Sequence, residues 1–286
     1  MSSRLIPVGL LIVAMVSIQT GASVAKRLFP LVGPQGTTAL RLIFGTVILL
    51  VVLRPWRTRR RPGSWKPLAG YGISLGLMNL LFYMALESMP LGIAVALEFT
   101  GPLAVAMIAS RRPLDFVWIA LAVSGLLLLL PVWGGMTGVD ARGAALALGA
   151  GICWALYIVF GQRAGTGHAT QTVALGSVIA ACVAAPVGVA HAGGALLSPA
   201  ILPLALAVAV LSSALPYSLE MLALTRLPAK TFGTLMSMEP AVATVSGMIF
   251  LKEWLAPSEW LAIALIIAAS VGTTVTTAPP SAPVPD

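Results

Sequence analysis

The sequence divides into ten apolar segments, each close to the length that an α-helix needs to cross a lipid bilayer. Such a helix takes about 20 mostly apolar residues to cross a hydrocarbon core of roughly 30 Å. The expected spans lie near residues 7–25, 34–53, 67–87, 91–110, 114–131, 142–162, 170–190, 200–224, 229–250 and 257–276. The mean hydropathy of +0.98 and the hydrophobic share of 58% agree, because soluble domains are roughly 45–50% apolar. Little chain remains between the spans, so the sequence predicts an all-α polytopic membrane protein without a soluble domain.

The first segment has an alternative interpretation as a cleaved signal peptide. Arg4 precedes a short apolar run, and the small residues at 21–23 resemble a cleavage region. Gln19 and Lys26, however, lie beyond the apolar run. We therefore expect this segment to remain as the first span.

The net charge of +8 is distributed unevenly across the predicted membrane. The basic residues on the side of the N-terminus are Arg4, Arg54, Arg57, Arg59, Arg60, Arg61, Lys66, Arg111, Arg112, Arg163, Arg226 and Lys230. The opposite side holds Lys26, Arg27, Arg142 and Lys252. This positive-inside bias predicts that both termini are cytoplasmic. The cluster at 54–66, flanked by Trp56 and Trp65, is expected to set the topology and contact anionic lipid, and not to bind nucleic acid.

Four of the predicted spans contain an ionisable side chain, namely Arg41, Glu98, Glu220 and Glu239. Charge is rare in this chain, since Asp, Glu, Lys and Arg together make up 9% of it. A charged group inside the hydrocarbon region is unfavourable by several kcal/mol on most scales, so such groups usually mark the path of a solute or a proton. This pattern indicates a membrane transporter.

Two parts of the sequence, 85–102 and 223–240, align without a gap, and Pro90 and Pro102 match Pro228 and Pro240. Five spans in each half is an odd number, so a second copy must enter the membrane from the opposite face. Inverted repeats of this kind are common in transporters, with the substrate site at the repeat interface. We expect two inverted five-helix repeats at 1–135 and 136–277, followed by a disordered proline-rich tail at 278–286.

Glu98 lies four residues before Pro102. Proline lacks the amide that would bond the carbonyl of Glu98, so a carboxylate and a freed backbone oxygen occur together, with Thr100 nearby. Irregular backbone at this depth is tolerated where it is buried in protein or faces a wet cavity. The alternative is a kink that only shapes the helix, with Glu98 protonated or hydrogen-bonded.

Glu239 directly precedes Pro240 near the centre of the ninth span. In the repeat alignment Glu239 falls opposite Gly101, three residues after Glu98, and positions three apart share a helix face. Both carboxylates are therefore expected to face one cavity. An acid in a cavity that opens to either side can exchange a proton for a cation. We hypothesise that Glu98 and Glu239 bind the ammonium group of a zwitterionic solute in one state and a proton in the other.

The other two buried charges have more than one interpretation. Glu220 lies nearer the inner surface and could be a relay, an inner gate or a partner of Arg226. Arg41 lies about one-third into its span, within reach of the outer surface by snorkelling. It could also pair with a substrate carboxylate or with Glu98.

Four stretches of the sequence resemble one known family, and they are residues 90–102 (PLGIAVALEFTGP), 149–157 (GAGICWALY), 214–228 and 231–241 (TFGTLMSMEPA). Together they are similar to the threonine/homoserine exporter group of the drug/metabolite transporter superfamily, the EamA type. The resemblance runs from Ser17 to about Thr274. It implies a ten-helix, two-repeat carrier of the bacterial inner membrane that exports small amino acids by proton exchange. It also implies that spans four and nine border the cavity and that spans five and ten are peripheral.

The residues expected at the kinks and around the cavity lie mainly in these stretches, and they are Thr100, Pro102, Ser237, Pro240, Tyr157 and Trp154. The expected partners are a small zwitterionic amino acid, protons and membrane lipid. A fold match does not fix the ligand. A broad-range exporter of drugs or other metabolites and an amino-acid importer therefore stay open as alternatives.

An intramembrane enzyme is the main alternative from another class. The histidines, His168 and His191, fall at loop edges without the His-Glu-x-x-His motif of a zinc protease. No two acids lie close in sequence within a span, as a magnesium site would require. Cys153 and Cys182 fall in spans without metal-ligand spacing. We expect no catalytic residue, no metal and no cofactor.

Overall fold

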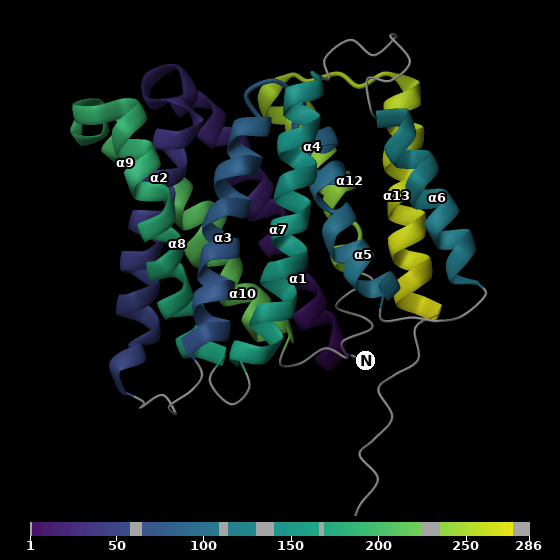
Figure 1. Cartoon of the computed structure of the whole chain (residues 1–286), viewed down its shortest axis with the longest axis horizontal. Helices are drawn as coiled ribbons and strands as arrows, with labels where there is room; N and C mark the ends of the chain where they lie inside the picture. The colour runs from purple at the N-terminus through teal and green to yellow at the C-terminus, as the bar shows by residue number, and fades with distance from the viewer. Residues whose placement is uncertain are drawn as a thin grey trace, which may run out of the picture.

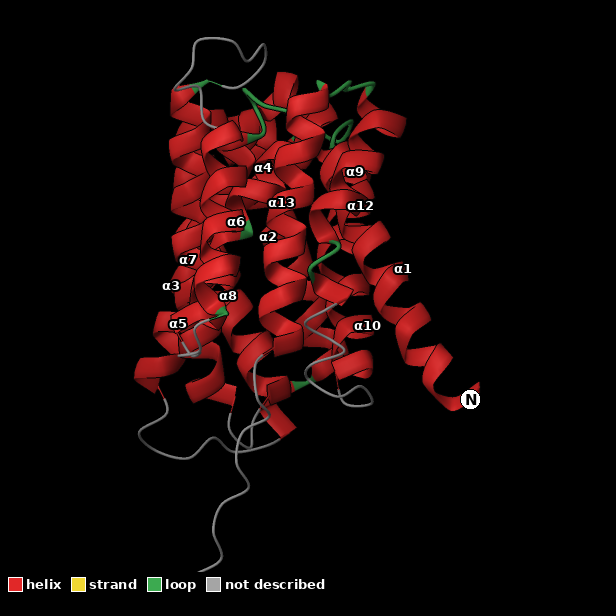
Figure 2. Cartoon of the chain, turned by 90° about the vertical axis from the view of Figure 1, so that its right-hand side faces the viewer, coloured by secondary structure: helices red, strands yellow, loops and turns green. Residues whose placement is uncertain are grey.

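The computed structural model describes residues 2–57, 65–108, 114–129, 140–165, 169–224 and 235–276. These residues form helices joined by short turns, with no strand among them, and most helices stand side by side along one direction (Figures 1 and 2). This confirms the prediction of an all-α fold. The proline-rich tail at 278–286 and part of the second repeat copy, 225–234, lie outside the described residues.

Every predicted span contains helix. The helices are α1 (Ser2–Ala25), α2 (Phe29–Leu53), α3 (Trp65–Ala85), α4 (Leu91–Glu98), α5 (Thr100–Ile108), α6 (Asp115–Leu129), α7 (Ala141–Gly165), α8 (Ala169–Ala192), α9 (Leu202–Ala209), α10 (Leu215–Leu224), α12 (Glu239–Ser246) and α13 (Pro257–Thr276). A 3-10 turn, Lys26–Leu28, joins α1 to α2, and two others are Pro55–Arg57 and Gly193–Leu197. A π-helical turn, Val210–Ala214, joins α9 to α10, and a second, Gly247–Leu251, follows α12.

Within the described part of the chain, five helical segments are long and apolar enough to cross a membrane by length and composition. They are Ile6–Arg57, which contains both α1 and α2, Trp65–Ala85, Ala141–Ala164, Gln171–Leu197 and Leu202–Glu220. Shorter apolar helices are Leu91–Val105, Phe116–Leu128, Glu239–Leu251 and Pro257–Gly272. Large apolar side chains such as Val13, Val51 and Phe116 are exposed, as in helices that face lipid.

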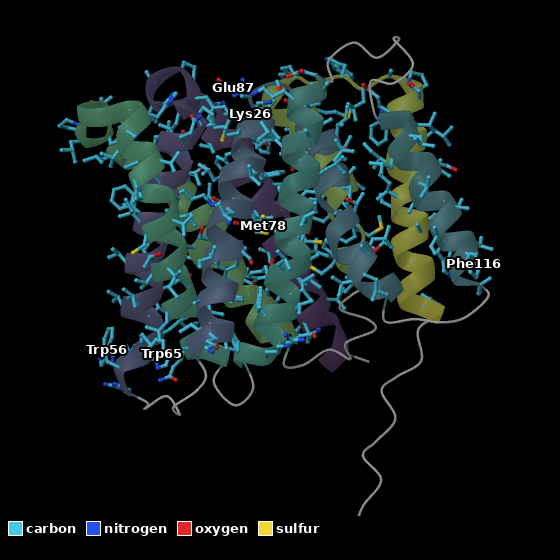
Figure 3. All side chains as sticks on the ribbon, viewed as in Figure 1. Lys26, Trp56, Trp65, Met78, Glu87 and Phe116 are labelled. Carbon is cyan, nitrogen blue, oxygen red and sulfur yellow. The ribbon has the colours of Figure 1, made fainter. Side chains whose placement is uncertain are left out.

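The two ends of the helical bundle carry different residues. Trp56 and Trp65 lie at one end, here called the Trp56 end, and Lys26 and Glu87 lie at the other, the Lys26 end (Figure 3). The helix α1 begins at the Trp56 end, and α13 runs back to that end (Figure 1). The start of α1 and the end of α13 therefore lie on the same side of the bundle.

The packing partners of the helices put α4 in the centre. All residues of α4 are buried, and α4 packs against α7 and α12. Around it α3 packs against α7 and α8, α2 against α8 and α9, and α1 against α10 and α12. The pair α6 and α13 packs together at one side of the bundle (Figure 1). These two helices correspond to spans five and ten, which the family resemblance had placed at the periphery.

Both predicted proline kinks are breaks in the helices. One residue, Phe99, separates α4 from α5, and a turn at 237–238 precedes α12. Pro102 and Pro240 lie in the first turn of α5 and α12, where a missing amide removes no helical hydrogen bond. At the first break the Thr100 hydroxyl donates to the Leu97 carbonyl at 2.6 Å. The Thr100 side chain thus supplies a hydrogen bond to a backbone oxygen at the break.

Two glycines let the first break lie directly against α7. A Cβ built on Gly151 would come within 2.7 Å of the Glu98 carbonyl oxygen. A Cβ built on Gly101 would overlap the Gly151 carbonyl oxygen. Close backbone approach of this kind is what small residues permit between membrane helices. The carbonyl of Glu98 therefore faces α7 and is covered by it.

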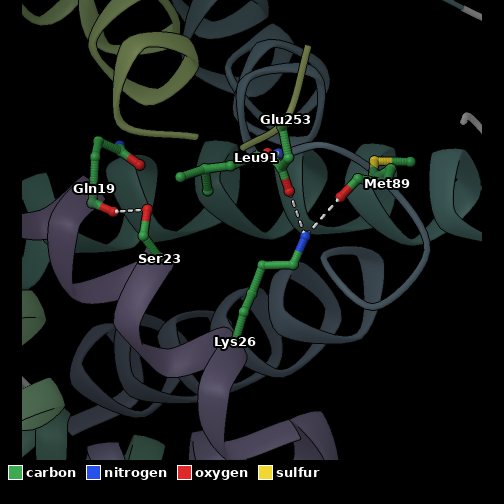
Figure 4. Close-up of polar contacts among 6 residues, drawn as sticks. All are labelled: Gln19, Ser23, Lys26, Met89, Leu91 and Glu253. Carbon is green, nitrogen blue, oxygen red and sulfur yellow. Dashed lines mark hydrogen bonds and ion pairs between the residues drawn. The ribbon is translucent and has the colours of Figure 1, made fainter. Parts of the chain in front are cut away.

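An ion pair ties three segments together at the Lys26 end (Figure 4). The Lys26 ammonium lies 2.7 Å from Glu253 Oε1 and also donates to the Met89 carbonyl at 3.3 Å. The other oxygen, Glu253 Oε2, accepts from the Leu91 amide at 2.7 Å, so it caps the first turn of α4. The contact joins the α1–α2 turn, the loop before α4 and the segment before α13.

The glycine contact predicts a stability difference between two alanine variants. Gly101→Ala forces α5 away from α7, and overpacking of this kind costs typically about 1–3 kcal/mol. The control is Gly149→Ala in α7, where the added Cβ meets only Leu81 Cδ1, at 3.4 Å. Thermal unfolding in detergent should show a lower midpoint for Gly101→Ala and little change for Gly149→Ala. Equal midpoints would mean that the backbones do not approach this closely.

Candidate functional site

Arg41 of α2 is 4% exposed. Its guanidinium donates hydrogen bonds to acceptors on two other elements. Its Nη1 donates to Asn79 Oδ1 at 2.7 Å, its Nη2 to the Ser212 carbonyl at 2.9 Å and its Nε to Ser213 Oγ at 3.2 Å. The guanidinium also lies over the ring of Tyr83, 5.1 Å from its centroid. Arg41 is therefore a fixed group, and it does not snorkel to the surface.

Local structure explains why these acceptors are available. The π-helical turn Val210–Ala214 departs from α-helical bonding, and such turns leave backbone groups free for other partners. The Ser212 carbonyl uses this freedom to bind Arg41. On α3 the amide nitrogen of Asn79 donates to the Leu75 carbonyl at 2.8 Å. That bond leaves Asn79 Oδ1 directed at the guanidinium.

All of these partners of Arg41 are neutral. Among the described residues no acidic side chain lies within ion-pair distance of Arg41. The ion pair that these residues do form joins Lys26 to Glu253, at the Lys26 end. A buried charge is normally paired with an opposite charge or neutralised. Each nitrogen of the Arg41 guanidinium therefore donates a hydrogen bond, but none of these acceptors carries a negative charge.

Glu239, the first residue of α12, is 6% exposed. Its Oε1 accepts a hydrogen bond from Gln19 Nε2 of α1 at 3.1 Å. Its Oε2 is buried and has no hydrogen-bond partner among the described residues. A buried oxygen without a donor is unfavourable, so this carboxylate has an open position for a proton or a cationic ligand.

Glu98, the last residue of α4, is 7% exposed. Its carboxylate is close enough to interact electrostatically with both Glu239 and Arg41. The sequence had predicted that the two acids face one cavity. The structure places Glu98 within electrostatic range of Glu239 and Arg41, but neither acid lines the two voids described below, so the shared cavity stays a prediction. Two carboxylates near each other in a low-dielectric region repel, and a bound cation or proton relieves that repulsion.

Glu220 of α10 is half-buried and interacts electrostatically with Glu239. It also lies near the hydroxyl groups of Tyr71, Tyr157 and Tyr217. The proposed pairing with Arg226 falls outside the described residues. Glu220 is thus within electrostatic range of Glu239 and of tyrosines on α3, α7 and α10.

Trp154 and Tyr157, the aromatic residues of α7 that were expected around the cavity, are both half-buried. Each of them contacts another aromatic ring. Tyr157 accepts a hydrogen bond from the Tyr71 hydroxyl at 3.3 Å, and the two rings stack with centroids 4.7 Å apart. Trp154 meets Phe99 edge to face at 5.6 Å. Because Phe99 is the residue between α4 and α5, Trp154 supports the break that positions Glu98.

Ser237 packs against α13. It is fully buried, and its hydroxyl oxygen is 2.7 Å from that of Ser270 in α13. Ser237 therefore fixes the turn before α12 against α13. The Thr100 hydroxyl bonds within its own segment, to the Leu97 carbonyl. The contacts described therefore direct neither hydroxyl at the charged groups.

Two small voids lie along α2. The first is lined by Leu42, Gly45, Thr46, Leu49, Leu75, Ser177, Ser213 and Tyr217. The second is lined by Leu49, Leu53, Val173, Tyr217 and Ser218. The two share Leu49 and Tyr217, and together they follow α2 from Ser213, a partner of Arg41, to the last residue of α2. They extend toward the Trp56 end.

Five residues of the site were not among those predicted, namely Gln19, Asn79, Tyr83, Ser212 and Ser213. Gln19 and Asn79 carried a usable signal, because amide side chains inside apolar spans commonly bond across helices. No three His, Cys, Asp or Glu side chains cluster as metal ligands in the described part of the chain.

Comparison with known proteins gives the family. The model of the EamA-like transporter family matches residues 5–130 and again residues 141–275. The chain belongs to the EamA-like transporter family. This membership confirms the resemblance seen in the sequence, and it identifies the chain as a multi-pass membrane transporter and not an enzyme.

Individual relatives agree with the family assignment. Proteins named “Threonine/homoserine exporter RhtA” from Escherichia coli (strain K12) and Salmonella typhimurium (strain LT2) are each 62% identical over 271 residues, 95% of this chain and 92% of theirs. An “Uncharacterized transporter YwfM” of Bacillus subtilis (strain 168) is 26% identical and covers 82% of both chains. A solved structure described as “Crystal structure of protein” shares the fold, with a TM-score of 0.64 and 18% identity over 93% of this chain and 96% of that one.

The arginine contacts predict that Asn79 contributes to stability. Asn79→Leu leaves a buried guanidinium donor without an acceptor, which costs roughly 1–3 kcal/mol or more for a charged group. The control is Met78→Leu, a swap of similar volume at the neighbouring half-buried position. Thermal unfolding in detergent should show a lower midpoint for Asn79→Leu alone. A midpoint equal to that of Met78→Leu would contradict this role.

Proposed function

We propose that the protein exports small amino acids of the threonine/homoserine type across the bacterial inner membrane, by alternating access and in exchange for protons. The printed name of the relatives at 62% identity supports the substrate class and the direction, since the match covers 95% of this chain. Their bacterial sources support the inner membrane, where lipid surrounds the apolar helix surfaces.

The observation that carries the proposal is the separation of opposite charges in one buried region. Among the described residues, Arg41 has no acidic side chain within ion-pair distance, and one carboxylate oxygen of Glu239 has no hydrogen-bond donor. A free amino acid carries a carboxylate and an ammonium group on one carbon atom. Its carboxylate suits Arg41, because guanidinium groups bind carboxylates with paired hydrogen bonds. Its ammonium group suits the acids Glu98 and Glu239.

Proton exchange follows from the same acids. The repulsion between Glu98 and Glu239 is relieved by an ammonium group when substrate is bound and by a proton when it is absent. Release of the amino acid on one side therefore favours uptake of a proton there. Glu220, which interacts with Glu239, is the proposed relay between this pair and the Trp56 end.

The pattern of helix packing supports two inverted repeats at 1–135 and 136–277. In that scheme α5 corresponds to α12, and α3 corresponds to the segment from α9 to α10. The contacts α2–α8 and α6–α13 then map onto themselves, and α3–α7 maps onto α10–α1. The helix breaks at Phe99 and Ser237 are the same number of residues apart in the sequence as Pro102 and Pro240. The two family matches also fall in separate halves.

The two ends of the bundle differ in a way that supports alternating access. At the Lys26 end the ion pair with Glu253 joins three segments, whereas the two voids along α2 run from Ser213 toward the Trp56 end. We assign the Trp56 end to the cytoplasm from the positive-inside bias. An exporter loads its substrate from that side, with its outer end closed.

The first test is counterflow in proteoliposomes across an amino-acid panel, with and without a pH gradient. Glu98→Gln and Glu239→Gln remove the charge and keep the shape, so each should lower gradient-driven flux by about tenfold or more, equivalent to 1.4 kcal/mol, with membrane insertion intact. Glu87→Gln, at the Lys26 end, is the matched control. Full coupled flux in both of the buried variants would exclude these acids as the proton carriers.

A second test concerns the charge on Arg41. Asn79→Asp places a carboxylate where the 2.7 Å hydrogen bond now lies, so the protein supplies the anion that the substrate should bring. We expect a rise in the apparent KM of about tenfold or more, because the substrate carboxylate must compete with a fixed one. Asn79→Gln, which keeps a neutral amide, should be milder. An unchanged KM in Asn79→Asp would exclude Arg41 as the carboxylate site.

A further inference from the structure

Tyr83 of α3 is fully buried, and its hydroxyl has no hydrogen-bond partner among the described residues. A buried hydroxyl without a partner is unfavourable, since it loses its bonds to water. A phenylalanine at this position would fill the same space without that penalty, and the neighbouring residue, Phe82, is a phenylalanine. A tyrosine at this position is therefore explained if another molecule supplies the missing partner.

The ring of Tyr83 is fixed beside the charged groups. The Arg41 guanidinium lies 5.1 Å from the ring centroid. Phe29 and Phe82 each contact the ring, with centroids 6.0 Å away. Asn79, which binds Arg41, precedes Tyr83 by one helical turn and so shares its helix face. A ligand whose carboxylate binds Arg41 lies next to this ring.

Other tyrosines near the site differ in this respect. The hydroxyls of Tyr71 and Tyr157 bond to each other at 3.3 Å. Tyr217 borders both voids and interacts electrostatically with Tyr83 and Arg41. Tyr83 is thus a buried tyrosine beside Arg41 whose hydroxyl has no hydrogen-bond partner among the described residues.

We infer that the Tyr83 hydroxyl binds the side-chain hydroxyl of the substrate and selects hydroxylated amino acids over their deoxy analogues. This rests on the proposed function. The site then holds its ligand at three points, with Arg41 on the carboxylate, the two acids on the ammonium group and Tyr83 on the side chain. A phenolic hydroxyl can donate or accept, so it suits a hydroxyl on either the β- or the γ-carbon.

The test is competition in proteoliposome counterflow among threonine, homoserine and 2-aminobutyrate, which matches both in its backbone and lacks the hydroxyl. The wild-type protein should prefer each hydroxylated substrate by about tenfold, the value of one good hydrogen bond. Tyr83→Phe should bring that preference close to one by weakening the hydroxylated substrates, with 2-aminobutyrate exchange retained. Tyr71→Phe, from the same helix, should leave the preference unchanged.

Each outcome has one meaning. A Tyr83→Phe protein that keeps the preference, or that loses all three substrates equally while folded, overturns the inference and leaves the proposed function standing. A wild-type protein that exchanges the three equally well overturns it without any variant. A wild-type protein that exchanges none of them overturns the proposed function, and the inference with it.

Discussion

The structure depends on how a single positive charge is accommodated inside a mostly apolar bundle. Arg41 is buried in α2, and the described contacts give it hydrogen-bond acceptors without an opposing charge. An acidic partner would satisfy the guanidinium more strongly, but it would also neutralise the group. The neutral amide of Asn79 and the carbonyl of Ser212 accept hydrogen bonds from the buried guanidinium without neutralising its charge. That requirement explains a π-helical turn at 210–214 and an asparagine in the middle of α3.

The acids are placed by broken helices, and the breaks are held by packing. Glu98 ends α4, and Glu239 begins α12, so each carboxylate sits where the helical ladder is interrupted. At the first break Gly101 and Gly151 bring two backbones together, and Trp154 packs on Phe99. The irregular backbone is therefore covered by protein, as the absence of water in a bilayer requires. Rigid breaks fix the distance between the acids and the arginine.

Much of the fold could be predicted from the sequence, because hydropathy and proline positions act locally. The apolar segments, the breaks at Pro102 and Pro240 and the burial of Glu98 and Glu239 all follow from such patterns. Pro216, four residues after Ser212, marks the irregular turn that frees the Ser212 carbonyl. The contacts of Arg41 with Ser212 and Ser213 could still not be predicted in this way, because these residues lie far from Arg41 in sequence. The same holds for Lys26 and Glu253. Periodicity shows which face of a helix is polar but not which helix it meets.

The contacts of Arg41 also constrain the order in which the protein matures. Asn79 comes from the first half of the chain, whereas Ser212 and Ser213 come from the second. When α2 enters the bilayer during synthesis, the π-helical turn does not yet exist, so the guanidinium must remain hydrated or near the headgroups. It reaches its final depth only when the halves dock. Neither half can then complete biogenesis alone, and docking itself becomes the step at which the cell can distinguish finished protein from unfinished.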